Sequence, residues 1–309
     1  MSTATTVKKT HNAKSAVEVH PLSILAGAEI TGVDLREPLN AQEVADIRAA
    51  LLKWKVVFFR DQHIDDGQQV AFARNFGELT VGHAVYGATK EHPEIYAVTK
   101  EAELDRHTPD VMVKPWRNWH TDITPAINPP SGSILRGVVV PPYGGDTQWT
   151  NLAAAYDALS DVMKGIVDGL RAVHRYPRRP VSDHVKESEP VLSSEHPLVR
   201  VHPETGEKIL FVSPVFISSI VGMKPRESEI LMEFLWEHAI RPEFTVRFKW
   251  NEGDMAFWDN RATAHLPPTD IFQSDFDRLH HRVTLMGDIP VGVDGRPSKP
   301  LGGEPISAV

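Results

Sequence analysis

The chain has 309 residues, of which 41% are hydrophobic and 24% charged, as in an ordinary globular protein with one well-buried core. Its formal net charge of -8 argues against non-specific nucleic-acid binding, which needs a basic surface. No apolar run approaches the length of a membrane span, so we expect no membrane partner and cytoplasmic residence. Because cysteine is absent, histidine and carboxylate side chains are the available metal ligands.

The first half of the chain alternates short strands and helices. Residues 1–16 are polar and are predicted to form a disordered leader, before a single catalytic domain over residues 17–290 and a surface tail over residues 291–309. In order, the sequence predicts two strands within Glu18–Leu35, a helix over Ala41–Leu52, a strand over Val56–Phe59 and a helix over Asp65–Phe76. The segment His83–Pro115 has few periodic features, so we expect an active-site loop there.

Short β-rich runs separated by Gly and Pro dominate the second half. Strands are predicted over Ser133–Val140, Thr147–Thr150, Ile209–Val212, Thr245–Trp250, Asp254–Asp259 and Val283–Gly287. Leu, Ile and Met recur at helical spacing over about Ser160–His174 and Pro225–Ala239, which predicts two helical insertions. We therefore predict a mainly β protein with helical insertions, built as a double-stranded β-helix, or jelly-roll barrel.

Two histidines and one aspartate carry the strongest functional pattern. His120 and Asp122 are two positions apart in an extended segment, so their side chains point to the same face and can chelate one ion. His265 follows the strand-like run that ends at Asp259. Two imidazoles and one carboxylate hold a non-haem Fe(II) on one face and leave the opposite positions for a co-substrate and O₂. The pattern predicts an iron oxygenase.

An arginine beyond the distal histidine supports the same chemistry. Arg278 follows His265 in the sequence. Its planar guanidinium is the fork that would hold the far end of a dicarboxylate co-substrate.

With their flanking residues, these positions resemble the taurine dioxygenase family of Fe(II)- and 2-oxoglutarate-dependent oxygenases, which includes alkylsulfatase and aryloxyalkanoate members. The resemblance runs from about Val17 to about Pro290. It is carried by GAEITGVDL from Gly27, KVVFFR from Lys55, WHTD from Trp119, GGDTQW from Gly144, WDNRAT from Trp258 and HRVTL from His281.

The resemblance implies a role for each residue of the site. The implied groups are His120, Asp122 and His265 for Fe(II), Thr147 and Arg278 for the distal carboxylate of 2-oxoglutarate, and Arg282, His83, Tyr86, Trp116 and Phe216 for the substrate. Within the last group, Arg282 would grip the anionic end of the substrate. Trp116 stands where the taurine enzyme has an asparagine, which makes the pocket more apolar, and Pro125 stands where that enzyme has a phenylalanine.

The implied reaction is hydroxylation of a small anionic substrate, coupled to conversion of 2-oxoglutarate and O₂ to succinate and CO₂. The presence of Asp122 favours hydroxylation over halogenation, since halogenating relatives lack this carboxylate. We favour an alkyl sulfonate or alkyl sulfate, which would give an aldehyde plus sulfite or sulfate. A guanidinium suits a carboxylate equally, so an aryloxyalkanoate is the alternative substrate.

Two hypotheses come from other classes: a catalytically silent jelly-roll binding protein, and a zinc hydrolase on the same ligands. A silent relative would typically have lost a metal ligand or Arg278, and a hydrolase would not need a dicarboxylate anchor. We also expect a homo-oligomer, either a dimer or a tetramer. The basic cluster Arg175, Arg178 and Arg179 is either a solvated loop or a guard at the entrance for an anionic substrate.

Overall fold

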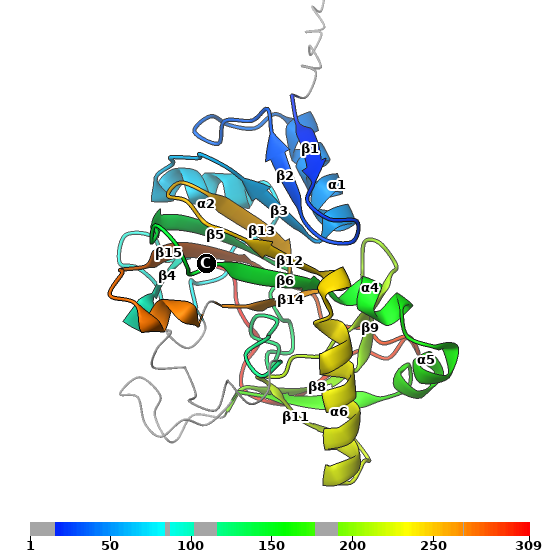
Figure 1. Ribbon diagram of the computed structural model, residues 1–309. Coiled ribbons are helices and arrows are strands. Elements are labelled where there is room, and N and C mark those ends of the chain that lie inside the picture. Colours follow the sequence, from blue (N-terminus) through cyan, green and yellow to red (C-terminus); the bar gives the residue numbers. More distant parts are fainter. Residues whose placement is uncertain (1–15, 84–86, 102–115, 177–190, 268) are drawn as a thin grey trace, which may run out of the picture.

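The computed structural model of the chain describes residues 16–83, 87–101, 116–176, 191–267 and 269–309 (Figure 1). The expected leader up to residue 15, Tyr86, Arg178 and Arg179 lie outside the described residues. None of the helices described has both the length and the apolar character needed to cross a lipid bilayer. The molecule is mainly sheet, as the sequence predicted.

The largest sheet has seven strands, and its centre carries buried apolar residues on both faces. In spatial order its strands are β1 (Glu18–Pro21), β2 (Ala28–Thr31), β3 (Val56–Phe59), β13 (Met255–Asp259), β5 (Gly132–Val139), β15 (Leu279–Leu285) and β4 (Ile95–Thr99). Strands β2 and β3 run parallel, and the other neighbours are antiparallel.

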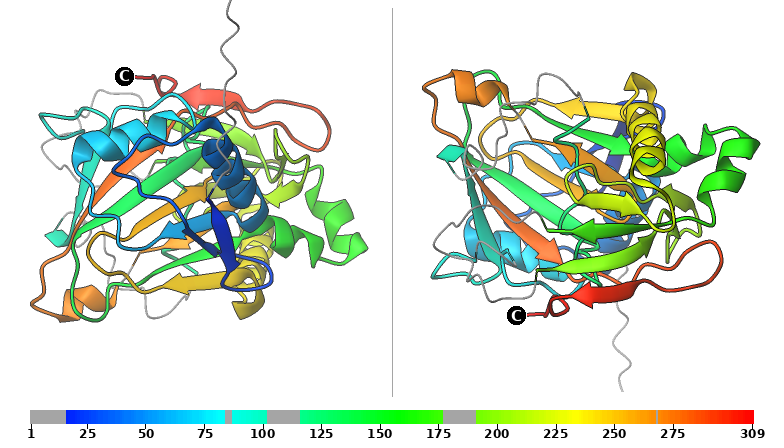
Figure 2. Two further views of the ribbon diagram at one scale, coloured as in Figure 1. Left: turned by 90° about the horizontal axis from the view of Figure 1, so that it is seen from above. Right: turned by 90° about the horizontal axis from the view of Figure 1, so that it is seen from below.

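Three smaller sheets lie on the other side of the molecule. Their strands, in spatial order, are β12 (Thr245–Phe248), β6 (Thr147–Asn151) and β14 (Thr263–Leu266); β11 (Ile217–Ile220), β7 (Arg171–Arg175), β8 (Ser193–Pro197) and β16 (Lys299–Gly302); and β10 (Lys208–Leu210) and β9 (Val199–Val201). Figure 2 shows, from two directions, the seven-stranded sheet facing these smaller sheets.

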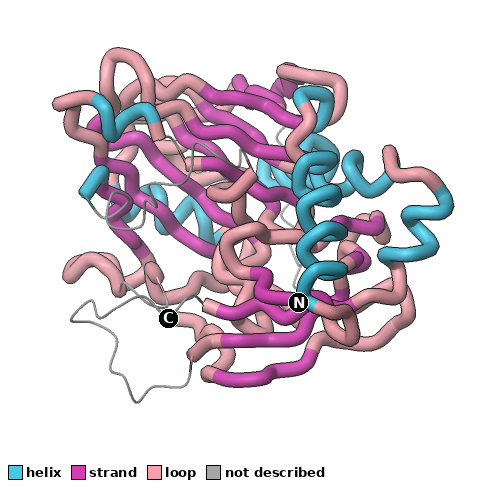
Figure 3. The backbone as a smooth tube through the Cα atoms, turned by 60° about the horizontal axis from the view of Figure 1, so that its bottom comes forward, coloured by secondary structure: helices cyan, strands magenta, loops and turns pink. Residues whose placement is uncertain are grey.

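Helices cover the outside of this arrangement (Figure 3). They are α1 (Ala41–Trp54), α2 (Asp66–Arg74), α4 (Leu152–Asp157), α5 (Asp161–Val167) and α6 (Pro225–Ala239), with 3-10 turns at Pro242–Phe244 and Asp270–Gln273. Asn40 and Asp65 begin α1 and α2 with reciprocal capping bonds, so the two helix starts follow from local chemistry. Both helices pack on the seven-stranded sheet, whereas α4 and α6 pack over the smaller sheets.

Two predicted elements were wrong in part. The helix expected over Ser160–His174 ends at Val167, and its last four residues belong to β7. Gly169 interrupts the helical run, because glycine is a poor helix former. The loop expected over His83–Pro115 contains β4, whose short run of β-branched and aromatic residues pairs with β15 at the sheet edge.

The C-terminal segment, expected as a surface tail, takes part in the fold. Strand β16 pairs with β8, and the backbone N–H of Ile306 donates to Asn128 at 2.9 Å. Residue Ala308 forms a backbone bridge with Thr80. The tail thus contributes hydrogen bonds to three separate regions of the protein, at β8, Asn128 and Thr80.

Strand β15 positions the site because its two faces differ. His281 points toward α2, where its Nδ1 lies 2.7 Å from the carboxylate of Asp66. Val283 lies in the apolar core under α1 and α2. Since side chains alternate along a strand, Arg282 and Thr284 lie on the opposite face, between the sheets, and both are buried.

Candidate active site

The backbone itself brings the two histidines of the predicted metal site together. The N–H of His120 donates to the carbonyl of His265 at 2.9 Å, and the N–H of His265 donates back at 2.7 Å. This pair is an isolated antiparallel bridge between β14 and the segment that carries Asp122. The hydroxyl of Thr121 adds a bond of 2.7 Å to the carbonyl of Thr263. Thr121 therefore points away from Asp122, as the alternation along an extended segment predicts.

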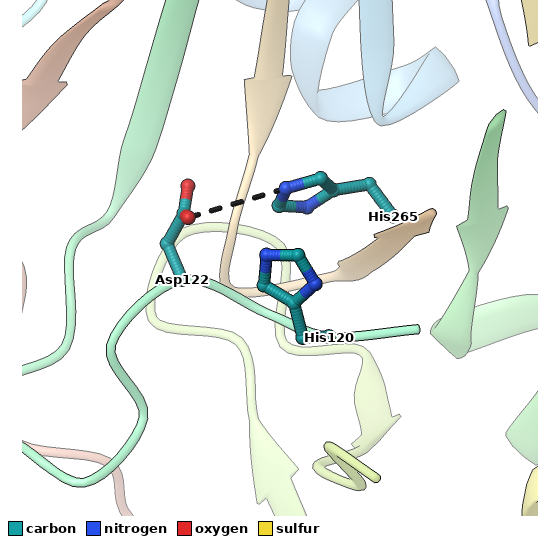
Figure 4. A group of neighbouring side chains, drawn as sticks. All are labelled: His120, Asp122 and His265. Carbon is teal, nitrogen blue, oxygen red and sulfur yellow. Dashed lines mark ion pairs between the residues drawn. The ribbon is translucent and has the colours of Figure 1, made fainter. Parts of the chain in front are cut away.

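The side chains of His120, Asp122 and His265 converge (Figure 4). One potential ligand atom from each lies within 4.8 Å of the others, and Nε2 of His265 is 4.0 Å from Oδ1 of Asp122. The two imidazole ring centres are 4.2 Å apart. Two ring nitrogens and one carboxylate oxygen around one point match the donor set that a non-haem Fe(II) takes.

Both histidines are prepared to act as neutral ligands. Nδ1 of His120 lies 3.0 Å from the carbonyl of Asn118, which can only accept, so the proton sits on Nδ1 and Nε2 carries the lone pair. Burial, followed by the charge of His120, lowers the pKa of His265 to about 3. Nδ1 of His265 is buried and has no hydrogen-bond partner among the described residues. Nε2 of the same ring, 4.0 Å from Oδ1 of Asp122, is the nitrogen that faces the carboxylate and could bind a cation.

Asp122 is held by a row of hydrogen bonds from the seven-stranded sheet. Ser133 donates to its Oδ2 at 2.7 Å, Asn260 donates to the Ser133 hydroxyl at 2.8 Å, and Trp258 donates to Asn260 at 2.8 Å. Sequence reasoning assigned no role to Ser133 or Asn260. Their only sequence indication was that Asn260 belongs to the WDNRAT segment. Such partners orient a metal ligand and tune its basicity.

Arg282 also contacts Asp122. Its Nη1 donates to Oδ1 at 2.8 Å, and both side chains are buried. Burial alone would raise the pKa of Asp122, but Arg282 and the two histidines outweigh it and hold that pKa well below its usual range. The family resemblance implied that Arg282 grips the anionic end of the substrate. Asp122 already supplies one anionic partner for Arg282. Only the guanidinium nitrogens that do not contact Asp122 could therefore bind a substrate.

The turn before β6, which leads to Thr147, lies against Arg278 at Gly145. Gly145 has a φ of +72°, and a Cβ added there would lie 3.6 Å from Cδ and Nε of Arg278. The positive φ favours glycine, and the 3.6 Å approach packs the turn on the arginine. Thr147 follows two residues later, is buried, and accepts a bond of 3.0 Å from the indole N–H of Trp250.

The other predicted substrate residues have different surroundings. Phe216 lies edge-on to His120, with ring centres 6.3 Å apart, so it lines the metal site. The ring of His83 lies near the ring of Tyr96 in β4. The sequence did not indicate a role for Tyr96, because the stretch that contains it was predicted to be a loop. Trp116 packs on Trp236 of α6 within a buried apolar cluster.

The family comparison matches nearly all of this architecture. The model described as "Taurine catabolism dioxygenase TauD, TfdA family" matches residues 18–284. The chain belongs to the TauD/TfdA family. It is an Fe(II)- and 2-oxoglutarate-dependent dioxygenase, with 2-oxoglutarate and O₂ as co-substrates.

Individual relatives cover almost the whole chain. An alpha-ketoglutarate-dependent sulfate ester dioxygenase of Pseudomonas putida is 40% identical over 296 residues, which are 92% of this chain and 94% of that protein. An alkylsulfatase of Acinetobacter baylyi is 35% identical, over 93% and 90% of the two chains. The crystal structure of a taurine dioxygenase from Burkholderia xenovorans is 57% identical, with a TM-score of 0.85 and coverage of 94% and 96%.

Proposed function

We propose that this dioxygenase hydroxylates a small organic sulfate or sulfonate at the carbon that carries the sulfo group. With a sulfate ester, insertion of one oxygen atom of O₂ into that C–H bond gives a hydroxylated ester, which collapses to an aldehyde and sulfate. The second oxygen atom enters succinate as 2-oxoglutarate loses CO₂. An alkyl sulfonate would give an aldehyde and sulfite in the same way. The sulfate ester dioxygenase and alkylsulfatase among the relatives support this substrate class.

In this proposal His120, Asp122 and His265 hold Fe(II). Their converging donor atoms, with Nε2 of His265 4.0 Å from Oδ1 of Asp122, support the assignment. When bound, the iron supplies the activation of O₂ that no side chain can perform. The row from Ser133 keeps the Asp122 carboxylate ionised and correctly turned, and the backbone bridge keeps the imidazoles side by side.

Arg278 and Thr147 are proposed to bind the distal carboxylate of 2-oxoglutarate. A guanidinium and a hydroxyl offer three hydrogen-bond donors to one carboxylate, and an ion pair of this kind is strong where water is excluded. Both side chains are buried and come from segments that pack on each other at Gly145. The Trp250 indole, which donates to Thr147, leaves the threonine hydroxyl hydrogen available to a carboxylate.

The observation that carries the substrate assignment is the state of the Arg282 guanidinium. Nη1 is bonded to Asp122, whereas Nε and Nη2 are buried and have no hydrogen-bond partner among the described residues. These two nitrogens form one edge of the guanidinium and point in parallel, so they match two oxygens of a single oxyanion. Buried charged donors without partners are costly, and a bound sulfo group would satisfy both.

Charge balance supports a substrate with one negative charge. Fe(II), Asp122, Arg278 and Arg282 together carry three net positive charges, while neutral histidines add none. The 2-oxoglutarate dianion offsets two of them. One positive charge remains for the substrate, which fits the monoanion of an alkyl sulfate or sulfonate. An aryloxyalkanoate would balance the charge equally, so it stays the alternative.

The remaining predictions extend this proposal. We propose that the sheets together form a double-stranded β-helix, that the protein resides in the cytoplasm, and that it assembles as a homodimer or homotetramer. Size-exclusion chromatography with light scattering would measure the oligomeric state. The taurine dioxygenase structure of similar shape supports the barrel.

The test is succinate formation with Fe(II), ascorbate and 2-oxoglutarate across alkyl sulfates, alkyl sulfonates and aryloxyacetates, for wild type and Arg282→Lys. The lysine variant keeps a cation for Asp122 and removes the free edge of the guanidinium. We expect the best substrate to be an organic sulfate or sulfonate, and its KM to rise at least about tenfold in Arg282→Lys. Preference for aryloxyacetates would replace the substrate class, and an unchanged KM would remove Arg282 from the substrate site.

A further inference from the structure

Tyr96 lies directly across from Arg282 in the seven-stranded sheet. In the pairing of β4 with β15, Tyr96 and Arg282 are register partners, and Leu135 of β5 is the register partner on the other side. Side chains of partners point to the same face. Tyr96 is therefore on the inner face, beside the arginine that the proposed function gives to the substrate.

The tyrosine ring contacts two residues of the proposed substrate site. Cζ of Arg282 lies 5.4 Å from the ring centre of Tyr96, within the range of a cation–π contact. The His83 ring centre is 5.0 Å from the Tyr96 ring centre. The three side chains form a row and keep only 6 to 8% of their surface exposed, as expected where a small pocket reaches a core.

This contact has a geometric consequence for Arg282. An arginine side chain has several rotatable bonds, and one hydrogen bond at Nη1 fixes a point but leaves the guanidinium plane free to turn about it. An aromatic face supplies the second constraint, because a guanidinium prefers to lie flat over a ring. With both constraints, the edge formed by Nε and Nη2 points in one direction.

We propose that Tyr96 is a positioning residue that aims the free edge of Arg282 at the anionic group of the substrate and holds His83 at the same anion-binding subsite. This inference rests on the proposed role of Arg282. The aromatic ring performs the task, and the phenol hydroxyl is not required. Tyr96 therefore affects recognition of the substrate. It does not affect the binding of 2-oxoglutarate, which is the proposed role of Arg278 and Thr147.

The test compares Tyr96→Leu with Tyr96→Phe, using the alkyl sulfate that wild type converts with the lowest KM. We expect Tyr96→Leu to raise that KM about five- to thirtyfold, while Tyr96→Phe stays within about twofold. The dissociation constant of 2-oxoglutarate, measured anaerobically by calorimetry with Fe(II) present, should stay within about twofold in both. Val98→Ala is the matched control, since Val98 shares the inner face of β4 but pairs with His280.

A double-variant cycle separates positioning from general loosening of the sheet. In an Arg282→Lys background, Tyr96→Leu should add less than about twofold to KM, because the guanidinium edge it aims is gone. An unchanged KM in Tyr96→Leu, or an equal loss of 2-oxoglutarate affinity, would overturn the proposal for Tyr96. If Arg282→Lys itself leaves KM unchanged, the proposed function fails first, so the two failures are distinguishable.

Discussion

Two pairs of histidine rings lie within 5 Å of each other in the part of the chain that the structure describes, and only one pair is joined by a carboxylate in a potential metal site. The rings of His120 and His265 are 4.2 Å apart, and those of His174 and His196 are 4.9 Å apart. Asp122 completes the first pair, and these three residues are the one group of potential metal ligands found among the described residues. Proximity of two imidazoles therefore does not make a metal site.

Three of the four ring nitrogens of the second pair form hydrogen bonds, and Nε2 of His174 is buried without a partner among the described residues. Nδ1 of His174 lies 2.8 Å from the hydroxyl of Thr124, and Nδ1 of His196 lies 2.7 Å from the hydroxyl of Ser298. Nε2 of His196 reaches the carbonyls of Thr124 and Ala126 at 2.7 and 3.1 Å. These two residues follow Asp122 in the chain. One histidine pair is placed to bind an ion, and the other anchors the segment that carries the carboxylate ligand.

Removing a ligand from the first pair should have the largest effect. We expect His120→Ala and His265→Ala to abolish succinate formation, because the ion loses one of three protein ligands, while circular dichroism shows a folded protein. Asp122→Ala should also abolish turnover, but it leaves Arg282 buried without its anion and should cost about 3–5 kcal/mol of stability. Near wild-type activity in His265→Ala would contradict the ligand assignment.

Removing a member of the second pair should instead lower stability. His196→Ala deletes a buried ring and its bonds to Ser298 and the Thr124 carbonyl, so we expect the free energy of unfolding to fall by about 2–4 kcal/mol. Urea denaturation measures this loss. His20→Ala, at an exposed position, is the control and should cost under about 0.5 kcal/mol. Equal losses in the two variants would show that the anchor contributes nothing.

Substitutions at Arg278 and Thr147, the proposed 2-oxoglutarate site, should have a smaller effect that is confined to 2-oxoglutarate binding. Arg278→Ala should raise the dissociation constant of 2-oxoglutarate at least about tenfold, since a charge-assisted hydrogen bond is worth roughly 1.5–3 kcal/mol. Thr147→Val should have a smaller effect. Both constants can be measured anaerobically by calorimetry. An unchanged constant in Arg278→Ala would remove that arginine from the 2-oxoglutarate site and leave the histidine comparison intact.

One histidine of each pair, His196 and His265, should contribute the same pH dependence to the stability of the metal-free protein. Burial lowers the pKa of His196 and of His265 to about 3, below the usual value of 6.5. The unfolded chain therefore binds more protons between these values, so this stabilisation is complete above pH 6.5 and is lost as pH falls toward 3. Each histidine contributes a slope of up to about 1.4 kcal/mol per pH unit. Urea unfolding at pH 5–7 should give a shallower slope for His196→Asn, and identical slopes would refute this.

Sequence reasoning worked where a pattern is local. The spacing of His120 and Asp122 predicted side chains on one face, which the structure places together, and the apolar helical repeat from Pro225 predicted the observed bounds of α6. The helix predicted over Asp65–Phe76 contains α2, which begins directly after the cap residue Asp65. In each case, residues that are close together in the sequence determine the local backbone conformation.

Features that depend on distant pairing could not be predicted. The Arg282–Asp122 bond joins residues 160 positions apart and follows from the register of β15. Strand β4 is five residues long in polar surroundings and gains its stability by pairing with β15, so its own sequence indicated little. Ser133 was missed for a similar reason, since a serine at the start of a strand gives no indication of the carboxylate it contacts.

The backbone bridge between His120 and His265 has a consequence for how quickly the protein can exchange its ion. The two hydrogen bonds at 2.9 and 2.7 Å join distant parts of the chain without help from any side chain. The chain between His120 and His265 is therefore already closed into a loop when the protein folds. The conformational entropy of that closure is lost during folding and not during metal capture. A chelator should remove the ion and leave a closed, receptive site. Reloading should then be limited by diffusion and dehydration of the ion, with no refolding phase in stopped-flow traces.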